Sequence, residues 1–437
     1  MSRYSEKNYQ EMVTELTRFA ELKEEYGSEG VTEIIDDFKK IVIEKTALLK
    51  SLPVDERKRR NEPDDYQEIL SLRPEGVRSM TDHLPKDYDS RLKGAFLARA
   101  AGCTLGAVVE NWSVEKMEGF ARKLKVPFPP VNYWPDVMDN LDTVRYIRGT
   151  MKDFILPYMD GVPVDDDISY VLTGLLILEK YGFDFTTTEV ASIWNQYVPM
   201  AYTAERIALE YIKKGLSPLI SGEDHNPYAQ WIGAAIRSDA FAYACPGQPE
   251  KAAMMAYHDA YLTHRRNGIY GEMFFAAAQS AAFCTNSSLE AIAAGLTEIP
   301  EKCELAEAIR WALSVCHQFR DYHEARKAVD EKFPGMSTVH TINNACLVVF
   351  GLALGQDDPN QVISQTIALG MDNDCTAATA GSITGAVNGA DSLQTKWVSP
   401  FRNKIHSYLN GIESFDIDDV LKRFKNLADR FYMSKTP

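Results

Sequence analysis

The sequence predicts an all-α protein: a single compact many-helix domain behind an N-terminal helical extension. Most long segments repeat apolar residues at helical spacing. Alternating apolar and polar residues, which are typical of strands, are nearly absent, and the one strand-like run, ACLVVFGLAL, suits a buried helix equally well. The chain has 437 residues and a hydrophobic content of 45%, which is enough for a sizeable core.

Two amphipathic helices are expected at the N-terminus. Residues 8–27 repeat apolar residues at helical spacing and stop at Gly27, a favourable residue just beyond a helix end. Residues 31–52 continue in the same manner, and a charged, proline-punctuated stretch follows, so we expect a boundary between roughly residues 52 and 88. Residues 1–85 would then form a helical extension that docks on the main domain or on a partner, and residues 88–437 would form the main domain.

From Arg91 onward the helical segments become rich in alanine and glycine, which allow backbones to approach closely. Small residues at this density predict helices that pack tightly against one another in a core. The segments that we expect to form such helices are residues 91–110, 169–182, 249–264 and 270–283.

The charge and the cysteine content exclude several classes of protein. A net charge of −15 and a pI near 5.1 argue against non-specific binding to nucleic acid or to an anionic membrane. Seven cysteines without CxxC spacing fit reduced thiols better than a disulfide framework. The N-terminus lacks an apolar signal region, and no apolar run reaches about 18 residues. We therefore expect a cytoplasmic protein that does not enter membranes.

Acidic residues gather at the predicted starts of two helices. Asp165, Asp166 and Asp167 directly precede one apolar helix, and Asp372 and Asp374 open another. Capping and the helix dipole explain one aspartate at each start, but neighbouring carboxylates repel one another. The competing explanation for each group is a solvated acidic turn. If the two helix starts face each other across one cleft, their oxygen ligands would suit Mg²⁺ or Mn²⁺.

Other catalytic and metal-binding motifs fail by spacing. A calcium-binding EF-hand loop that started at Asp372 would need Gly and Glu where Ala377 and Ile383 stand. The sequence contains no HExxH, Walker P-loop, GxGxxG or GxSxG motif. Glu110 ends the helix predicted over residues 91–110, and a lone glutamate at such a place is usually solvated.

Taken together, these segments resemble the ADP-ribosylglycohydrolase family, an all-α family with a two-magnesium site. The resemblance runs from about Arg91 to about residue 410, and it rests on four motifs in the family's order. The matching residues are Arg91, Gly94, Gly102, Gly106 and Glu110 in the first motif, Asp165–Asp167 in the second, Gly233, Ala235, Arg237, Thr263 and His264 in the third, and Gly370, Asp372, Asp374, Ala377 and Gly381 in the last.

The sequence also departs from the family pattern at three places. The aspartate of the first helix is Cys103, the threonine that heads the second motif is Asp165, and the threonine after the second aspartate of the last motif is Cys375. A thiol is a poor ligand for Mg²⁺, so this coordination position would pass to Thr376 or to water. Asp165 could compensate with an additional carboxylate. These changes suggest a divergent member of the family.

The resemblance implies a magnesium-dependent, glycosidase-type hydrolase with a binuclear metal site. Two Mg²⁺ ions, for which Mn²⁺ could substitute, would orient a ribose and activate a water, and an N- or O-glycosidic ADP-ribosyl bond at C1″ would be cleaved. The implied metal ligands are Asp165, Asp166, Asp167, Asp372, Asp374, Cys375 and Thr376. The implied catalytic residues are Glu110, Asp166, Asp167 and Asp374, and the implied substrate-binding residues are Gly233, Arg237, His264 and Tyr270.

Structural roles compete with these assignments at several positions. Arg237 could pair internally with Asp239, His264 could cap a helix or lie at the surface, and Tyr270 could belong to the core. Trp134 and Trp231 could stack on a base, although most tryptophans are structural.

Two other functions remain open on the sequence alone. The protein could hydrolyse a small N-riboside or nucleotide-sugar metabolite with the same metal pair, or it could be a non-catalytic relative that binds ADP-ribose or another nucleotide. Retention of mutually repelling carboxylates argues against a loss of catalysis. The expected partners are ADP-ribose, a ribosyl-containing small molecule or an ADP-ribosylated macromolecule.

Overall fold

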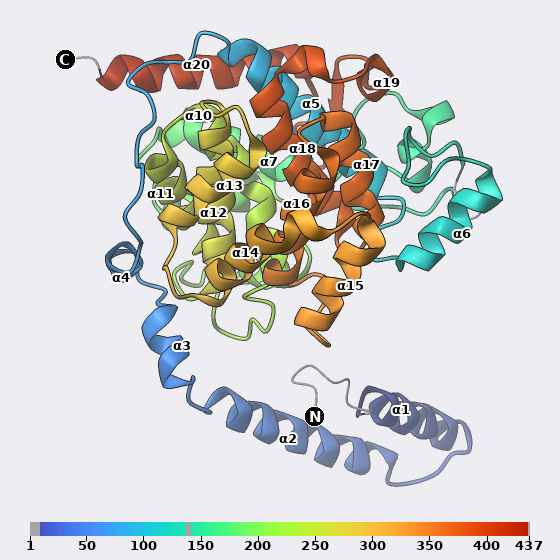
Figure 1. Ribbon diagram of the computed structural model, residues 1–437. Helices are drawn as coiled ribbons and strands as arrows, with labels where there is room; N and C mark the ends of the chain where they lie inside the picture. Colours follow the sequence, from blue (N-terminus) through green and yellow to red (C-terminus); the bar gives the residue numbers. More distant parts are fainter. Residues whose placement is uncertain (1–8, 137–140, 436–437) are drawn as a thin grey trace. The chain divides into compact units, whose positions relative to one another are not determined.

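Helices dominate the computed structural model, which describes residues 9–136 and 141–435 (Figure 1). Within these residues there are twenty α-helices, short 3₁₀ turns and one small β-hairpin. The all-α prediction is therefore confirmed. The strand-like run ACLVVFGLAL lies inside helix α16 (Thr341–Gly355), where nearly every residue is buried. No helix in the described part of the chain is both long and apolar enough to cross a bilayer.

The chain divides into two units by its internal contacts. The first comprises residues 1–60 with 334–336, and the second comprises residues 61–333 with 337–437. In the first unit, the two predicted amphipathic helices form as α1 (Tyr9–Glu25) and α2 (Val31–Lys50), followed by α3 (Glu56–Asn61) at the division. Gly27 follows α1 with a φ of +67°, a left-handed conformation that glycine adopts readily beyond a helix end.

Residues 61–85 belong to the second unit, although the sequence placed them in the extension. Asp65 caps α4 (Tyr66–Ser71) by accepting hydrogen bonds from two backbone amides of its first turn. Arg73 pairs with Glu298, which is fully buried, and Arg78 pairs with the same carboxylate at 2.8 Å. The structural division thus lies at residue 60, within the interval 52–88. The assignment of residues 1–85 and 88–437 as functional domains stays a prediction.

Helices α5 (Tyr88–Gly106) and α18 (Asn373–Asn388) pack against each other at the centre of the second unit (Figure 1). Their small residues permit this approach: a Cβ on Gly102 would overlap the backbone of Ala377, and a Cβ on Gly106 would overlap that of Asp374. The glycines of the first motif therefore bring the C-terminal end of α5 against the acidic start of α18. This contact positions the candidate site.

The remaining elements of the second unit surround this pair. They are α6 (Val114–Leu124), α7 (Asp166–Tyr181), α8 (Thr187–Tyr197), α9 (Thr203–Lys213), α10 (Asp239–Ala244), α11 (Pro249–Ala260), α12 (Asn267–Ala282), α13 (Ser288–Gly295), α14 (Glu304–Val315), α15 (Tyr322–Lys332), α17 (Pro359–Leu369), α19 (Thr395–Val398), α20 (Ile417–Lys435), and the antiparallel strands β1 (Lys404–His406) and β2 (Ser414–Asp416). Helices α16 and α17 pack against α18, and α10 and α20 pack against α7.

Candidate functional site

Acidic residues from three segments meet at one cleft of about 400 Å³. The cleft is lined by Glu110, which follows α5, by Asp166 at the start of α7, and by Asp372 and Asp374 at the start of α18. The two acidic helix starts therefore face a common space, the arrangement that a shared metal site would require. Asp165 and Asp167 lie just beneath this surface and are fully buried.

Capping accounts for one of the two helix starts and not for the other. Asp165 is the N-cap of α7, and its side chain accepts a hydrogen bond from the amide of Asp167 at 3.1 Å. Asp372 stands at the N-cap position of α18, but its side chain makes no capping hydrogen bond to the helix. The carboxylate of Asp372 is therefore left to face the cleft.

Three overlapping groups of side chains bring possible metal ligands together. Within each group the ligand atoms lie within 4.8 Å of one another. The groups are Glu110 with Asp372 and Asp374, Asp167 with Asp374 and Cys375, and Cys103 with Asp165 and Asp167. The thiol of Cys375 contacts Oδ2 of Asp167 at 3.2 Å, so the residue that replaces the family's threonine does face the carboxylates.

At the start of α18, three buried side-chain oxygens have no hydrogen-bond partner among the described residues: Oδ1 of Asn373, Oδ1 of Asp374 and Oγ1 of Thr376. Burial of a polar oxygen without a partner is costly, so a ligand or an ion is the natural complement. Since carboxylate and hydroxyl oxygens suit hard divalent cations, the donor set fits the metal that the sequence predicted.

Arg145 lies among these carboxylates and was not predicted. Its Nη2 atom is 3.2 Å from Oε2 of Glu110, 3.1 Å from Oδ2 of Asp165 and 3.6 Å from Oδ2 of Asp374. The other terminal nitrogen donates to the carbonyl of Ala107 at 2.9 Å. A single arginine in an irregular segment carries no periodic or motif signal, so the sequence offered no means of finding it.

Arg99 binds two buried carboxylates, one of which belongs to the acidic cluster. It is fully buried on α5, and its guanidinium pairs with Asp167 at 3.0 Å and with Asp239 at 2.7 Å. The suggested pair between Arg237 and Asp239 is therefore wrong, because Asp239 is occupied by Arg99. A charged residue within an otherwise small and apolar helix was the available sequence signal.

Burial and mutual repulsion raise the pKa values of the acidic residues. Burial and the charge of Asp372 raise the pKa of Glu110 to about 7, and burial and the charge of Asp165 raise that of Asp166 to about 7. The pKa of Asp374 lies well above its usual range, because of burial and the nearby Glu110 carboxylate. Burial and like charges therefore both favour the protonated forms of these carboxyl groups.

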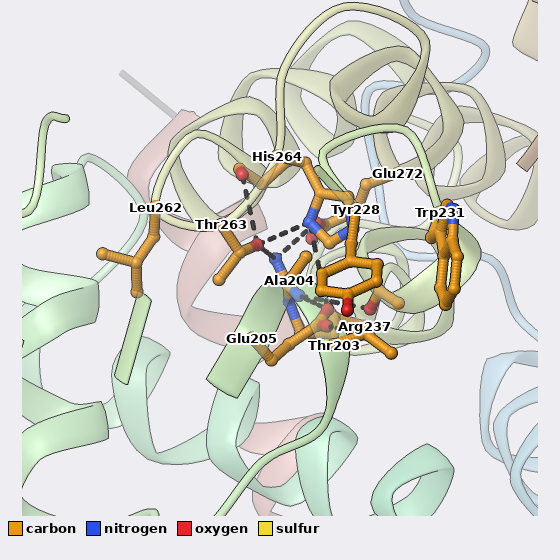
Figure 2. A network of polar contacts seen from close by, with 12 residues as sticks. Thr203, Ala204, Glu205, Tyr228, Trp231, Arg237, Leu262, Thr263, His264 and Glu272 are labelled. Atoms are coloured by element: carbon orange, nitrogen blue, oxygen red, sulfur yellow. Dashed lines mark hydrogen bonds and ion pairs between the residues drawn. The ribbon is translucent and has the colours of Figure 1, made fainter. Parts of the chain in front are cut away.

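A second charged network is centred on Arg237, and Figure 2 shows it from close by. Arg237 is held there by three carboxylates: Glu205 at 2.8 Å, Glu272 at 3.3 Å, and Asp259. It also donates to the hydroxyl of Thr263 at 2.9 Å. Because its charge is already neutralised, Arg237 has little capacity left for a phosphate.

The structure separates the four residues that the resemblance implied for substrate binding. Gly233 lines the cleft, whereas Arg237, His264 and Tyr270 are not among its lining residues. His264 is fully buried, so it is not the surface group that the sequence left open, and burial holds its pKa well below the usual range. Tyr270 is also buried, with its hydroxyl bonded to the carbonyl of Pro63, as expected of a core residue.

Other residues also line the cleft, and most of them were not predicted from the sequence. Tyr146 donates from its hydroxyl to Oδ1 of Asp166 at 2.6 Å, and its ring lies 5.6 Å from that of Tyr202. Glu205 also lines the cleft, and burial raises its pKa to about 7. Trp231, one of the two tryptophans considered for stacking, lines the cleft as well.

Trp134, the other tryptophan considered, is buried and donates to the carbonyl of Leu105 at 3.1 Å, which is a structural role.

Comparison with known proteins gives three findings. Residues 84–436 match the family model described as ADP-ribosylglycohydrolase. No curated protein matches the chain. Among solved structures, 46 chains match, including an "ADP-ribosylglycohydrolase-related protein complex" with a TM-score of 0.51 and 19% identity, over 80% of this chain and 100% of that chain. At this level of identity, the structural likeness shows a shared fold alone.

Proposed function

Because the chain belongs to the ADP-ribosylglycohydrolase family, we propose that it hydrolyses an N- or O-glycosidic ADP-ribosyl bond at C1″ with the help of two divalent ions. The expected ion is Mg²⁺, for which Mn²⁺ can substitute. One observation carries the proposal: Glu110, Asp372 and Asp374, from two distant segments, place ligand oxygens within 4.8 Å of one another at a cleft. The resulting product would be ADP-ribose released from a modified target.

The unpartnered oxygens of Asp374 and Thr376 support an ion at this place. The residues that would hold the ions are Asp165, Asp166 and Asp167 from α7, Asp372, Asp374 and Thr376 from α18, and Glu110. Cys375 is a weak ligand for Mg²⁺, and its thiol is already engaged with Asp167. Bound divalent ions would supply polarisation of substrate oxygens and neutralisation of the acidic cluster.

The chain's own residues would contribute proton transfer and orientation. Glu110 and Asp166 both line the cleft, where either carboxylate is placed to accept a proton from a bound water. The hydroxyl of Tyr146 fixes the direction of the Asp166 carboxylate through their 2.6 Å hydrogen bond. Tyr202 and Trp231 offer aromatic surface in the same cleft, against which a base or a sugar can pack.

Release of ADP-ribose tests this proposal directly. An ADP-ribosylated protein and a small N-riboside would be incubated with the enzyme, with Mg²⁺ or with a chelator. Asp374→Asn should lower the Mg²⁺-dependent rate by more than about 100-fold, because it removes a carboxylate shared by two ligand groups. Asp391→Asn, an exposed aspartate, is the matched control.

The outcomes separate the candidate functions. Cleavage of the small riboside alone would favour the metabolite hydrolase. Binding of ADP-ribose without any cleavage would favour a non-catalytic relative. A rate that persists at full strength in the chelator would contradict metal dependence.

A further inference from the structure

Arg145 contacts at least one carboxylate in each of the three ligand groups described above, and two in the group that lines the cleft. Its Nη2 atom reaches Glu110, Asp165 and Asp374 at 3.2, 3.1 and 3.6 Å. Glu110 and Asp374 are two of the three residues in the group that lines the cleft, so the guanidinium uses the same acceptors that an ion would use.

Both cations cannot hold these acceptors at once. A divalent ion seated among Glu110, Asp372 and Asp374 would bring two positive charges within a few ångströms of each other in a poorly solvated site, where their repulsion is strong. Glu110 would also exchange its hydrogen bond from Arg145 for a bond to the ion, and Asp374 would exchange its ion pair. Binding of one therefore opposes binding of the other.

The contacts around Arg145 bear on whether its side chain can move away from the carboxylates. Its Nε atom has no hydrogen-bond partner among the described residues, and the side chain lines the cleft. The backbone around it is fixed independently, by a hydrogen bond from the Arg145 amide to the carbonyl of Gly149 at 3.1 Å and one from Met151 to Thr143 at 2.9 Å. Rotation of the side chain into the cleft would break its hydrogen bond to the carbonyl of Ala107 and its contacts with the carboxylates, but none of these backbone hydrogen bonds.

We propose that Arg145 is a resident cation of the acidic site, and that its guanidinium and a divalent ion are alternative occupants of Glu110 and Asp374. The inference rests on the proposed function, because it assumes that the site takes a metal. It assigns to Arg145 a role in setting the affinity of the metal, which is separate from any part in bond cleavage.

Calorimetry of metal binding tests the competition. Arg145→Gln keeps much of the side-chain length and removes the charge, so it should bind Mg²⁺ and Mn²⁺ at least about tenfold more tightly than the native protein. Arg145→Lys retains a positive charge and should stay closer to the native affinity. Arg148→Gln, which removes an exposed arginine paired with Glu413 at 3.0 Å, should leave the affinity unchanged.

Thermal melting gives a second readout that does not depend on activity. Without metal, Arg145→Gln should melt at a lower temperature than Arg148→Gln, since the carboxylates lose their counter-charge. Saturating Mg²⁺ should raise the melting temperature of Arg145→Gln by more than it raises that of the native protein.

The results also distinguish failure of this inference from failure of the proposed function. Unchanged or weaker metal binding by Arg145→Gln, with normal binding by the native protein, would overturn the inference and leave the proposed function standing. Binding by Arg145→Gln alone would support the inference and remove the metal dependence of the native chain. Absence of binding in both proteins would overturn both.

Discussion

At the scale of single residues, the candidate site is governed by how each buried charge is matched. Asp167 and Asp239 share the fully buried Arg99, and Arg237 is surrounded by three carboxylates. Glu205 differs from these carboxylates because it lines the cleft as well as pairing with Arg237. Burial has the largest influence on the pKa of Glu205 and raises it, so the stability of the protein should depend on pH through this residue.

Glu205 should make the protein less stable as the pH rises. Burial raises its pKa in the folded chain to about 7, above the ordinary value of 4.5. The stability that it contributes is fully present below pH 4.5 and is lost as the pH rises through about 7. Glu205→Gln does not titrate, so its stability relative to the native protein should increase between pH 5 and pH 8 by up to about 3 kcal/mol.

Urea denaturation across this pH range measures the free energy of unfolding of both proteins. The contributions of other titrating groups cancel in the difference between the two values. Glu210→Gln, exposed on the same helix, should show no comparable change. A constant difference for Glu205→Gln would mean that this carboxylate is ionised at all the pH values tested.

At the scale of elements, the close packing of α5 and α18 brings the parts of the site together. Glu110 lies four residues after the end of α5, and Asp374 lies in the first turn of α18. The two side chains meet because glycines on α5 leave room for the backbone of α18. The pattern of small residues, which looks unremarkable in the sequence, is therefore a condition for the acidic cluster.

Gly102→Ala should destabilise the protein by about 1–3 kcal/mol, because the added methyl group overlaps the backbone of Ala377 and the helices must separate. Gly119→Ala on α6 is the matched control: its new methyl would meet only the end of Arg122, 3.8 Å away. A Gly→Ala change inside an open helix should stabilise by about 0.5–1 kcal/mol. Denaturant midpoints measure the stabilities of the Gly102→Ala and Gly119→Ala proteins. Equal effects of the two substitutions would contradict this account of the packing.

At the scale of the whole molecule, the boundary that matters for stability lies near residue 60. Residues 61–85 supply Arg73 and Arg78 to the buried Glu298, and the backbone of Asp64 accepts from the hydroxyl of Tyr257 at 3.0 Å. The family match begins only at residue 84, so this stretch lies outside the matched region but packs against it.

Two truncations test this boundary. Deletion of residues 1–60 should leave the melting temperature and the metal affinity of the second unit nearly unchanged. Deletion of residues 1–85 should destabilise by about 3–5 kcal/mol, because Glu298 would remain buried without Arg73 or Arg78. The same melting temperature for both truncated proteins would show that residues 61–85 contribute nothing to stability.

The sequence predicted what depends on local pattern and missed what depends on tertiary contact. Helix periodicity was sufficient to predict the fold class, and the acidic helix starts together with the family resemblance suggested that Asp166, Asp372 and Asp374 share one site. Arg145 and Glu205 were missed, because their neighbours come from segments remote in the chain. Arg237 was recognised as a candidate, but the partner suggested for it, Asp239, pairs with Arg99 instead, and the true partners of Arg237 come from other segments.

The pairing of the acidic cluster with Arg99 and Arg145 bears on how the protein exists without its cofactor. In many small metalloproteins the ion is the scaffold, so a chelator unfolds the chain. Here two guanidinium groups already balance part of the negative charge from within the polypeptide. We therefore expect the chain to stay folded when a chelator removes any bound ion, unlike proteins for which the ion is the scaffold.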